Sequence, residues 1–293
     1  MYYGEKHQIK DLKMKIKSGL IGAVIGTTLM VSCGSEPQEK VADTKEVEEV
    51  VQEVEETEYF VLPSTVQIGD LFRNSGLTYV NGYTLDPAKS STYNTTFDKY
   101  FAFGAYWTDM TYCALNGQSQ EARKYLKVIK EVSTDLGAGE VFNDEDLLNR
   151  FDRNLDNSDS ILSILIEIDE RTDAYVDDND QDEFALVAFV GGWVEGMYLG
   201  VSTTTYETHS ELTGKIIEQM VILDQLVIGM TKYEGSSKRV DQVLVSLKDL
   251  QKFFNEIPAI ADMEGRISEV KIPSADMQVL GNKILELRAL IVQ

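Results

Sequence analysis

Histidine and cysteine are scarce in this sequence of 293 residues, which contains only two of each. With His7 near the start and His209 far along the chain, sites that bind a metal through several histidines are excluded. Acid–base mechanisms that depend on histidine are weakened for the same reason. Cys33 and Cys113 cannot form a framework of several disulfides or a zinc cluster. We therefore expect no metal and no cofactor.

Basic residues are also few relative to acidic ones. Lysine and arginine total 27 residues against 49 aspartates and glutamates, which gives a net charge of −22 at pH 7. Nucleic-acid binding needs a basic surface, so nucleic acid is excluded as a partner. Motifs of common catalytic and nucleotide-binding sites are also missing: the sequence has no G-x-S-x-G elbow, no Walker loop and no dinucleotide fingerprint. The sequence therefore indicates no particular enzymatic activity.

The first 32 residues have the pattern of a secretory signal peptide. An apolar run over residues 20–31 follows five lysines. Twelve residues of helix rise about 18 Å, less than the ~30 Å hydrocarbon core, so the run suits a signal peptide better than a membrane span. A chain that began at Met14 would carry a compact signal peptide, and we interpret Met14 as the true start.

The apolar run ends in "LMVSC", which resembles a bacterial lipobox. Met30 stands three residues before Cys33, and Ser32 stands directly before it. The resemblance implies that cleavage leaves Cys33 as the mature N-terminus, with a lipid attached to its sulfur. An ordinary secreted protein with a cysteine at this boundary by chance is the alternative. Loss of residues 1–32 would remove five lysines and two acidic residues and leave a net charge near −25.

Residues 34–58 contain ten acidic residues, two basic ones and no aromatic ring. A segment of this composition cannot bury a core, so we interpret residues 33–58 as a lipidated cysteine followed by a solvated tether. A short helix for a partner, suggested by the valine spacing over 47–54, is the alternative. Gly34 rather than aspartate follows the cysteine, which by analogy with sorting rules argues against retention in the inner membrane. We expect a lipid-anchored protein of the cell envelope, on the periplasmic or surface face of the outer membrane.

Residues 59–293 predict an all-α domain, a multi-helix bundle of eight or nine helices. Strand-like alternation is scarce, and only four of the five prolines fall in this part. Asn143 is a predicted N-cap. Predicted left-handed C-terminal caps are Gly76, Gly137 and Gly235. The predicted helices span 64–75, 94–115, 119–136, 144–154, 158–178, 182–203, 209–233, 236–256 and 274–292.

Residues 103–112, "FGAYWTDMTY", resemble residues 190–199, "VGGWVEGMYL". Gly104 matches Gly191, and the order of the helices that follow is also similar. Two duplicated four-helix units, at 94–178 and 182–292, are one interpretation. Chance similarity between two buried helices is the other.

Residues 184–202 carry one charge in nineteen residues, which is apolar enough for a membrane span. A highly acidic stretch precedes them, and we interpret them as a buried core helix. Gly192, Gly196 and Gly200 share one face of this helix, where they permit close packing or leave space for a ligand. The preceding acidic run, 177–183, lacks the glycine and the final glutamate of a calcium loop and predicts a turn between helices.

Eight aromatic residues crowd the segment 93–112. Such clusters bind sugars or peptides in some proteins, but on an apolar helix they usually belong to the core. The candidate ligand pocket combines Trp107 from this segment with Gly192, Trp193 and Gly196 from the apolar helix.

Asp109 and Glu195 are ionisable residues within these two apolar helices. If the two carboxyl groups met in a pocket, they would suit acid–base catalysis or the binding of a cation. Paired with an arginine or bonded to tyrosine hydroxyls, they would instead be structural. Buried charges need partners in either case.

The stretch "RNSGLTYVNGYTLDPAKSSTYNTTFDKYFAFGAYWTDMTY", followed later by "VGGWVEGMYL", resembles uncharacterised all-helical lipoproteins of Bacteroidota. The resemblance covers most of the mature domain and implies no activity. We therefore expect a non-enzymatic binding or accessory module, with an envelope protein or a small solute as its partner. The rival hypothesis is a hydrolase or cation-dependent site built on Asp109 and Glu195.

Overall fold

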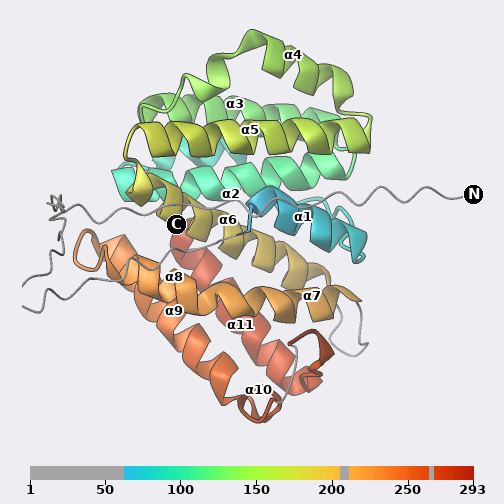
Figure 1. Ribbon diagram of the computed structural model, residues 1–293, viewed down its shortest axis with the longest axis vertical. Coiled ribbons are helices and arrows are strands. Elements are labelled where there is room, and N and C mark those ends of the chain that lie inside the picture. Colours follow the sequence, from blue (N-terminus) through green and yellow to red (C-terminus); the bar gives the residue numbers. More distant parts are fainter. Residues whose placement is uncertain (1–62, 205–210, 264–266) are drawn as a thin grey trace, which may run out of the picture.

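The computed structural model describes residues 63–204, 211–263 and 267–293, so Cys33, the predicted signal peptide and the predicted tether lie outside the described residues. Within these ranges every regular element is helical, which confirms the all-α fold class (Figure 1). The α-helices are α1 (Thr65–Asn74), α2 (Thr96–Leu115), α3 (Ser119–Asp135), α4 (Glu145–Asn154), α5 (Ser158–Asp178), α6 (Asp182–Thr203), α7 (Glu211–Gln219), α8 (Leu223–Thr231), α9 (Lys238–Glu256), α10 (Pro258–Ala261) and α11 (Ser274–Ile291). The 3-10 turns are η1 (Pro87–Thr92), η2 (Val141–Asn143), η3 (Met220–Ile222) and η4 (Ile267–Glu269).

Helix boundaries agree with the predicted ones at most positions, because the caps that mark them are local. All three predicted glycine caps adopt positive φ, with values of 103° at Gly76, 84° at Gly137 and 84° at Gly235. The predicted N-cap at Asn143 is wrong by one residue. Asp144 is the N-cap of α4, and its carboxylate accepts hydrogen bonds from the backbone N–H groups of Asp146 and Leu147.

The helix predicted over 209–233 is interrupted in the structure. The turn η3 separates α7 from α8, and its tighter winding rotates one helix relative to the other. Ile216 and Met230 thereby both stay buried, while Val221 in the turn is 54% exposed. This break was not predictable from the sequence, because apolar residues surround most of the helix circumference and such a pattern does not define which face is buried.

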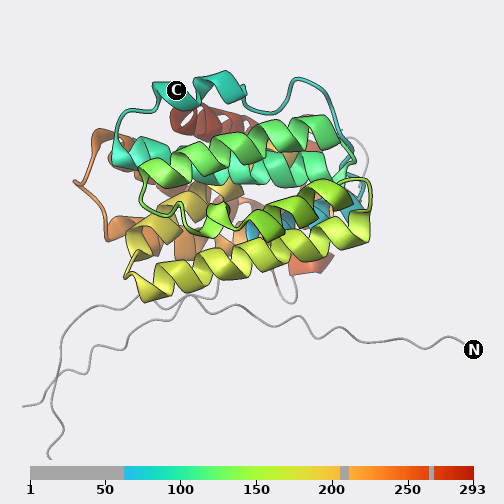
Figure 2. The same ribbon diagram turned by 90° about the horizontal axis from the view of Figure 1, so that it is seen from above.

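Helix α6 forms the centre of the domain, between α2–α5 on one side and α7–α11 on the other (Figure 1). Viewed from above, α3, α4 and α5 cover the first of these halves, with α4 between the other two (Figure 2). Among the described helices, α6 alone is long and apolar enough to cross a membrane, but 94% of its apolar window is buried inside the domain. Its apolar surface therefore serves the core, as predicted.

Glycines allow α2 and α6 to cross with their backbones in contact. A Cβ atom placed on Gly104 would lie 1.8 Å from the carbonyl oxygen of Ala188, and one on Gly191 would lie 2.2 Å from that of Phe101. The contact is reciprocal, since each glycine meets the carbonyl three residues before the other. This local symmetry agrees with the matched segments, but beyond it α2 packs mainly on α3 and α6 mainly on α11. Duplication of whole four-helix units stays a prediction.

The long connection between α1 and α2 is held down by tyrosine hydroxyls from the helices beneath it. Tyr112 donates to the carbonyl of Thr78 at 2.8 Å. Tyr125 of α3 donates to the carbonyl of Leu85 at 2.6 Å. Buried backbone groups in a loop need such partners, so these bonds fix the loop against the side of the bundle.

Candidate functional site

Asp109 of α2 and Glu195 of α6 meet in the interior, and both are fully buried. Arg288 of α11 reaches the same place and makes a two-pronged ion pair with Glu195. Its Nε donates to Oε2 at 3.0 Å, and its Nη2 donates to Oε1 at 3.0 Å. The guanidinium also lies over the ring of Tyr198, with its Cζ 4.0 Å from the ring centroid. Glu195 therefore has the arginine partner that a buried carboxylate requires.

Asp109 occupies a different environment although it adjoins the same pair. Its Oδ2 accepts a hydrogen bond of 2.8 Å from the backbone N–H of Leu85. No N–H or O–H group of the described residues donates to its Oδ1. A hydrogen bond links the Asp109 carboxyl group to Glu195, and such a bond requires a proton on one of them.

Electrostatics assign that proton to Asp109. Burial raises the pKa of Asp109 well above its ordinary value, and the charge of Glu195 raises this pKa further. Burial also raises the pKa of Glu195, but Arg288 and the hydrogen bond from Asp109 pull this pKa back down. The arrangement is a neutral acid donating to a carboxylate that is paired with arginine. It ties α2, α6, α11 and the Leu85 loop together.

An apolar cavity of about 80 Å³ lies elsewhere, where α1, α2, α5 and α6 converge. Buried aromatic side chains from α2 and α6 form much of its wall, and the start of α1 closes one side. Two half-buried aspartates of α5 supply its charge. The lining residues are Pro63, Ser64, Thr65, Phe103, Gly104, Trp107, Asp169, Thr172, Asp173, Val176, Phe184, Ala185, Ala188 and Phe189.

The two aspartates of this cavity are hard to ionise. Burial raises the pKa of Asp169 to about 6, although a hydrogen bond from the hydroxyl of Ser64 opposes the shift. Burial raises the pKa of Asp173 to about 7, and the charges of Asp169, Asp177 and Glu170 add to the effect. At neutral pH these aspartates are still partly ionised, and among the described residues no cationic side chain lines the cavity to balance their negative charge.

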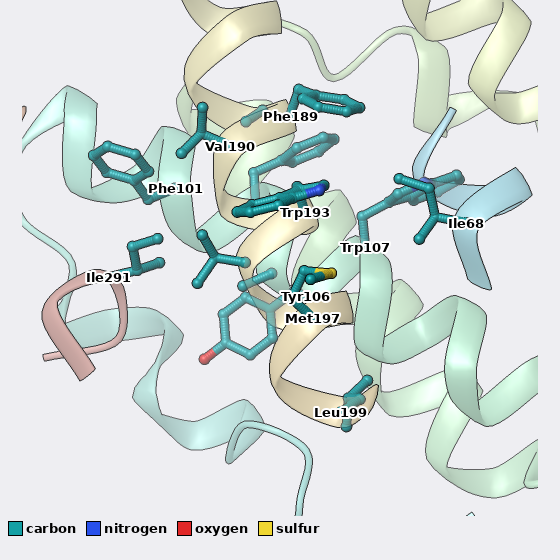
Figure 3. Packing of buried hydrophobic residues seen from close by; sticks show 14 of the residues in the cluster. Ile68, Phe101, Tyr106, Trp107, Phe189, Val190, Trp193, Met197, Leu199 and Ile291 are labelled. Atoms are coloured by element: carbon teal, nitrogen blue, oxygen red, sulfur yellow. The ribbon is translucent and has the colours of Figure 1, made fainter. Parts of the chain in front are cut away.

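Trp107 adds an unused hydrogen-bond donor to the cavity wall. The residue is 5% exposed, and its indole Nε1 is buried without a hydrogen-bond partner among the described residues. Trp107 lies on the side of α2 that faces Ile68 of α1 (Figure 3). Of the four predicted pocket residues, Trp107 alone lines this cavity.

The other three predicted pocket residues lie away from it. Gly192 and Gly196 line a gap of only about 20 Å³ between α1, α2 and α6. Trp193 is fully buried and lies with Met197 on α6, near Tyr106 of α2 (Figure 3). A further cavity of about 240 Å³ lies between α7 and residues 268–272. The structure does not bring the four predicted residues into one pocket.

Asp169 and Asp173 were not among the residues that the sequence analysis selected. Their spacing in the sequence could have identified them. Asp169, Asp173 and Val176 fall on one face of a helix, at a spacing of four and three residues. A carboxylate in line with buried apolar residues is unusual on a helix face. In the described ranges no three His, Cys, Asp or Glu side chains gather closely enough to hold a metal ion.

Comparisons with protein-family models, with curated proteins and with solved structures find no match to this chain.

Proposed function

We propose that this chain is an envelope-anchored lipoprotein whose acidic helical domain is a non-enzymatic binding module for a small solute. The cavity between α1, α2, α5 and α6 is its binding site. The observation that carries the proposal is the make-up of this cavity: apolar aromatic walls, two ionisable groups and an unused indole N–H. Small-molecule sites commonly combine apolar walls with a few polar groups in this way.

The envelope location rests on the sequence alone. It is supported by the apolar run, by the lipobox-like "LMVSC" and by the acidic segment that follows Cys33. A domain placed beyond such a tether would meet solutes or neighbouring envelope proteins at the membrane surface.

The rival function, a hydrolase or cation-dependent site built on Asp109 and Glu195, has weaker support. Both oxygens of Glu195 bond to Arg288, and one oxygen of Asp109 bonds to Leu85. Neither residue lines any of the three cavities described above. A catalytic pair needs access to a substrate, and the contacts of these two carboxyl groups are already made within the fold.

The proposal is tested with a soluble form of the predicted mature chain, residues 33–293, in which Cys33 is replaced by serine. Native mass spectrometry would detect binding of small organic solutes of cationic, neutral and anionic types. Ala185→Phe places a ring in the cavity and is the blocking variant, and Val245→Phe, at a residue 66% exposed, is the matched surface control. We expect a solute that binds the parent and the Val245→Phe variant but not the blocked one. Hydrolysis of a solute that disappears in Glu195→Gln would support the rival instead.

A further inference from the structure

We infer that the cavity between α1, α2, α5 and α6 takes an organic cation, a primary ammonium group carried on a short apolar chain. This inference rests on the proposed binding function and names the class of ligand. The juxtaposition that carries it is a carboxylate pair on α5 beside aromatic walls from α2 and α6.

The charged side of the cavity comes from α5 alone. Asp169 and Asp173 are one helical turn apart, so their carboxyl groups line the same wall. The charges that act on Asp173 are those of Asp169, Asp177 and Glu170, all of one sign. Arg171, the arginine between the two aspartates in sequence, pairs instead with Asp144 and Glu167. A cationic ligand would supply the countercharge that α5 does not.

The remaining walls supply no titratable group. Helices α2 and α6 contribute rings, among them Phe103, Trp107 and Phe184. Aromatic faces attract organic cations and also accept the apolar part of a ligand. Ser64, at the start of α1, uses its hydroxyl to cap that helix and to bond to Asp169.

Other classes of ligand fit less well. An anion would meet two carboxylates in a confined space, and their repulsion is strongest where water is excluded. A divalent metal ion prefers several oxygen ligands and a hydrated site, whereas most of this wall is apolar. A neutral solute would fill the space but leave the carboxylates without a countercharge.

Trp107 makes the test specific. The chain contains two tryptophans, so its ¹⁵N spectrum should show two indole N–H signals. Trp107 lines the cavity and Trp193 does not, which makes the second signal an internal control. A Trp193→Phe variant assigns the two signals.

The experiment titrates the same soluble mature chain at pH 8 with n-butylammonium, with its neutral analogue butan-1-ol and with its anionic analogue butyrate. We expect only butylammonium to move the Trp107 signal in a saturable way, with Trp193 unaffected. Asp169→Asn and Asp173→Asn should each weaken binding at least tenfold. Asp177→Asn, which removes the same charge from an exposed position on α5, should weaken it less than threefold. Binding should also weaken at pH 5.5, where both cavity aspartates take up protons.

A free primary amine and a lysine side chain can each present an ammonium group on a short alkyl chain. N-acetyl-lysine methylamide distinguishes the two sources: binding of this probe points to a lysine of a polypeptide, and binding of butylammonium alone points to a free amine. Equal binding of butan-1-ol and butylammonium, unchanged in the aspartate variants, would overturn the cation inference and leave the solute-binding proposal standing. No binding by any probe, in a chain whose two indole signals show that it is folded, would overturn the cation inference. The native mass spectrometry of cationic, neutral and anionic solutes then tests the proposed binding function separately.

Discussion

At the scale of single residues, the two pairs of acidic groups in this domain differ in what surrounds them. Glu195 is paired with the part-buried Arg288, whose charge also acts on Asp109, whereas Asp169 and Asp173 face an apolar cavity among other carboxylates. A buried acid with an arginine partner is held in place by the fold. Acids that face an open cavity without a cation are available to a ligand.

Arg288 holds the buried pair in place. Arg288→Met would leave the Glu195 carboxylate buried without its countercharge, and loss of one partner from a buried ion pair typically costs about 3–5 kcal/mol of unfolding free energy. Arg123→Met, which breaks an exposed pair with Asp152, should cost no more than about 1 kcal/mol. Urea denaturation of both variants measures the difference. Equal losses would show that the Glu195–Arg288 pair stabilises the fold no more than the exposed pair does.

Adding Glu195→Gln to Arg288→Met removes the stranded charge. We expect the double variant to recover part of the loss, because an uncharged amide is less costly to bury than an unpaired carboxylate. A double variant that is less stable than Arg288→Met alone would contradict this explanation.

The cavity aspartates should make the domain more stable in mild acid than at neutral pH. Their pKa values of about 6 and about 7 exceed the ordinary value of 3.8, so the folded chain holds their protons more tightly than the unfolded chain. The stability they contribute is complete below about pH 4 and is lost as the pH rises through 6 to 7. Allowing for their partial exposure, we expect a loss of about 2–4 kcal/mol between pH 4.5 and 7.5.

Urea denaturation across this pH range checks the expectation. The double variant Asp169→Asn/Asp173→Asn should show a smaller loss than the parent and should be the more stable protein at pH 7.5. The exposed control Asp177→Asn should follow the parent. A double variant with the parent's pH dependence would assign the effect to other groups, such as Asp109, whose pKa is also raised.

At the scale of elements, the crossing of α2 and α6 depends on glycine. Gly104→Ala would place a methyl group 1.8 Å from the carbonyl oxygen of Ala188, so the helices would have to separate. Such overpacking costs about 1–3 kcal/mol or more. The control is Gly214→Ala in α7, where a Cβ meets nothing within 4 Å and better helix propensity should add about 0.5–1 kcal/mol. Thermal unfolding that ranks the two variants in the opposite order would contradict the crossing geometry.

The glycine stripe of α6 shows what the sequence could and could not predict. Regular spacing correctly indicated a close approach between helices, and Gly192 has atoms of Thr65 and Thr108 within 3.0 Å of a Cβ position. Gly196 shares the same spacing, yet its nearest neighbour would lie at 3.8 Å. Sequence spacing defines a face of a helix, but the distance to the next helix depends on side chains far away in the chain.

Helix positions were predictable for a similar reason. Caps and glycine turns act over a few residues, so their effect can be read locally, as at Gly137 and Gly235. The cavity was not predictable, because it needs α1, α2, α5 and α6 to converge. The pairing of Glu195 with Arg288 joins residues 93 positions apart, and nothing in the local pattern selects that arginine.

At the scale of the whole molecule, we propose that a lipid anchor at Cys33 holds the acidic helical domain at the membrane. Cys33→Ser should release the protein from the membrane, because a serine cannot form the thioether that carries the acyl chains. Fractionation of cells that express the parent and the variant would measure this, with Cys113→Ser as the matched control. Intact-mass analysis of the mature parent should show Cys33 as the lipidated N-terminus. An unmodified Cys33 in the mature parent would contradict the anchor.

The large negative charge of the chain fits the account at this scale. A net charge of −22 repels anionic solutes and attracts cationic ones over distances of about a Debye length, ~8 Å at physiological salt. This attraction is general, whereas the carboxylates of α5 would hold a cation at one place.

The most direct test of the central claim is a crystal structure of the soluble chain with n-butylammonium. We predict that the alkyl chain lies among Phe103, Trp107 and Phe184, with its nitrogen within hydrogen-bonding distance of Asp169 and Asp173. A cavity that stays empty at saturating butylammonium, or a cation bound instead at Asp109 and Glu195, would contradict the account.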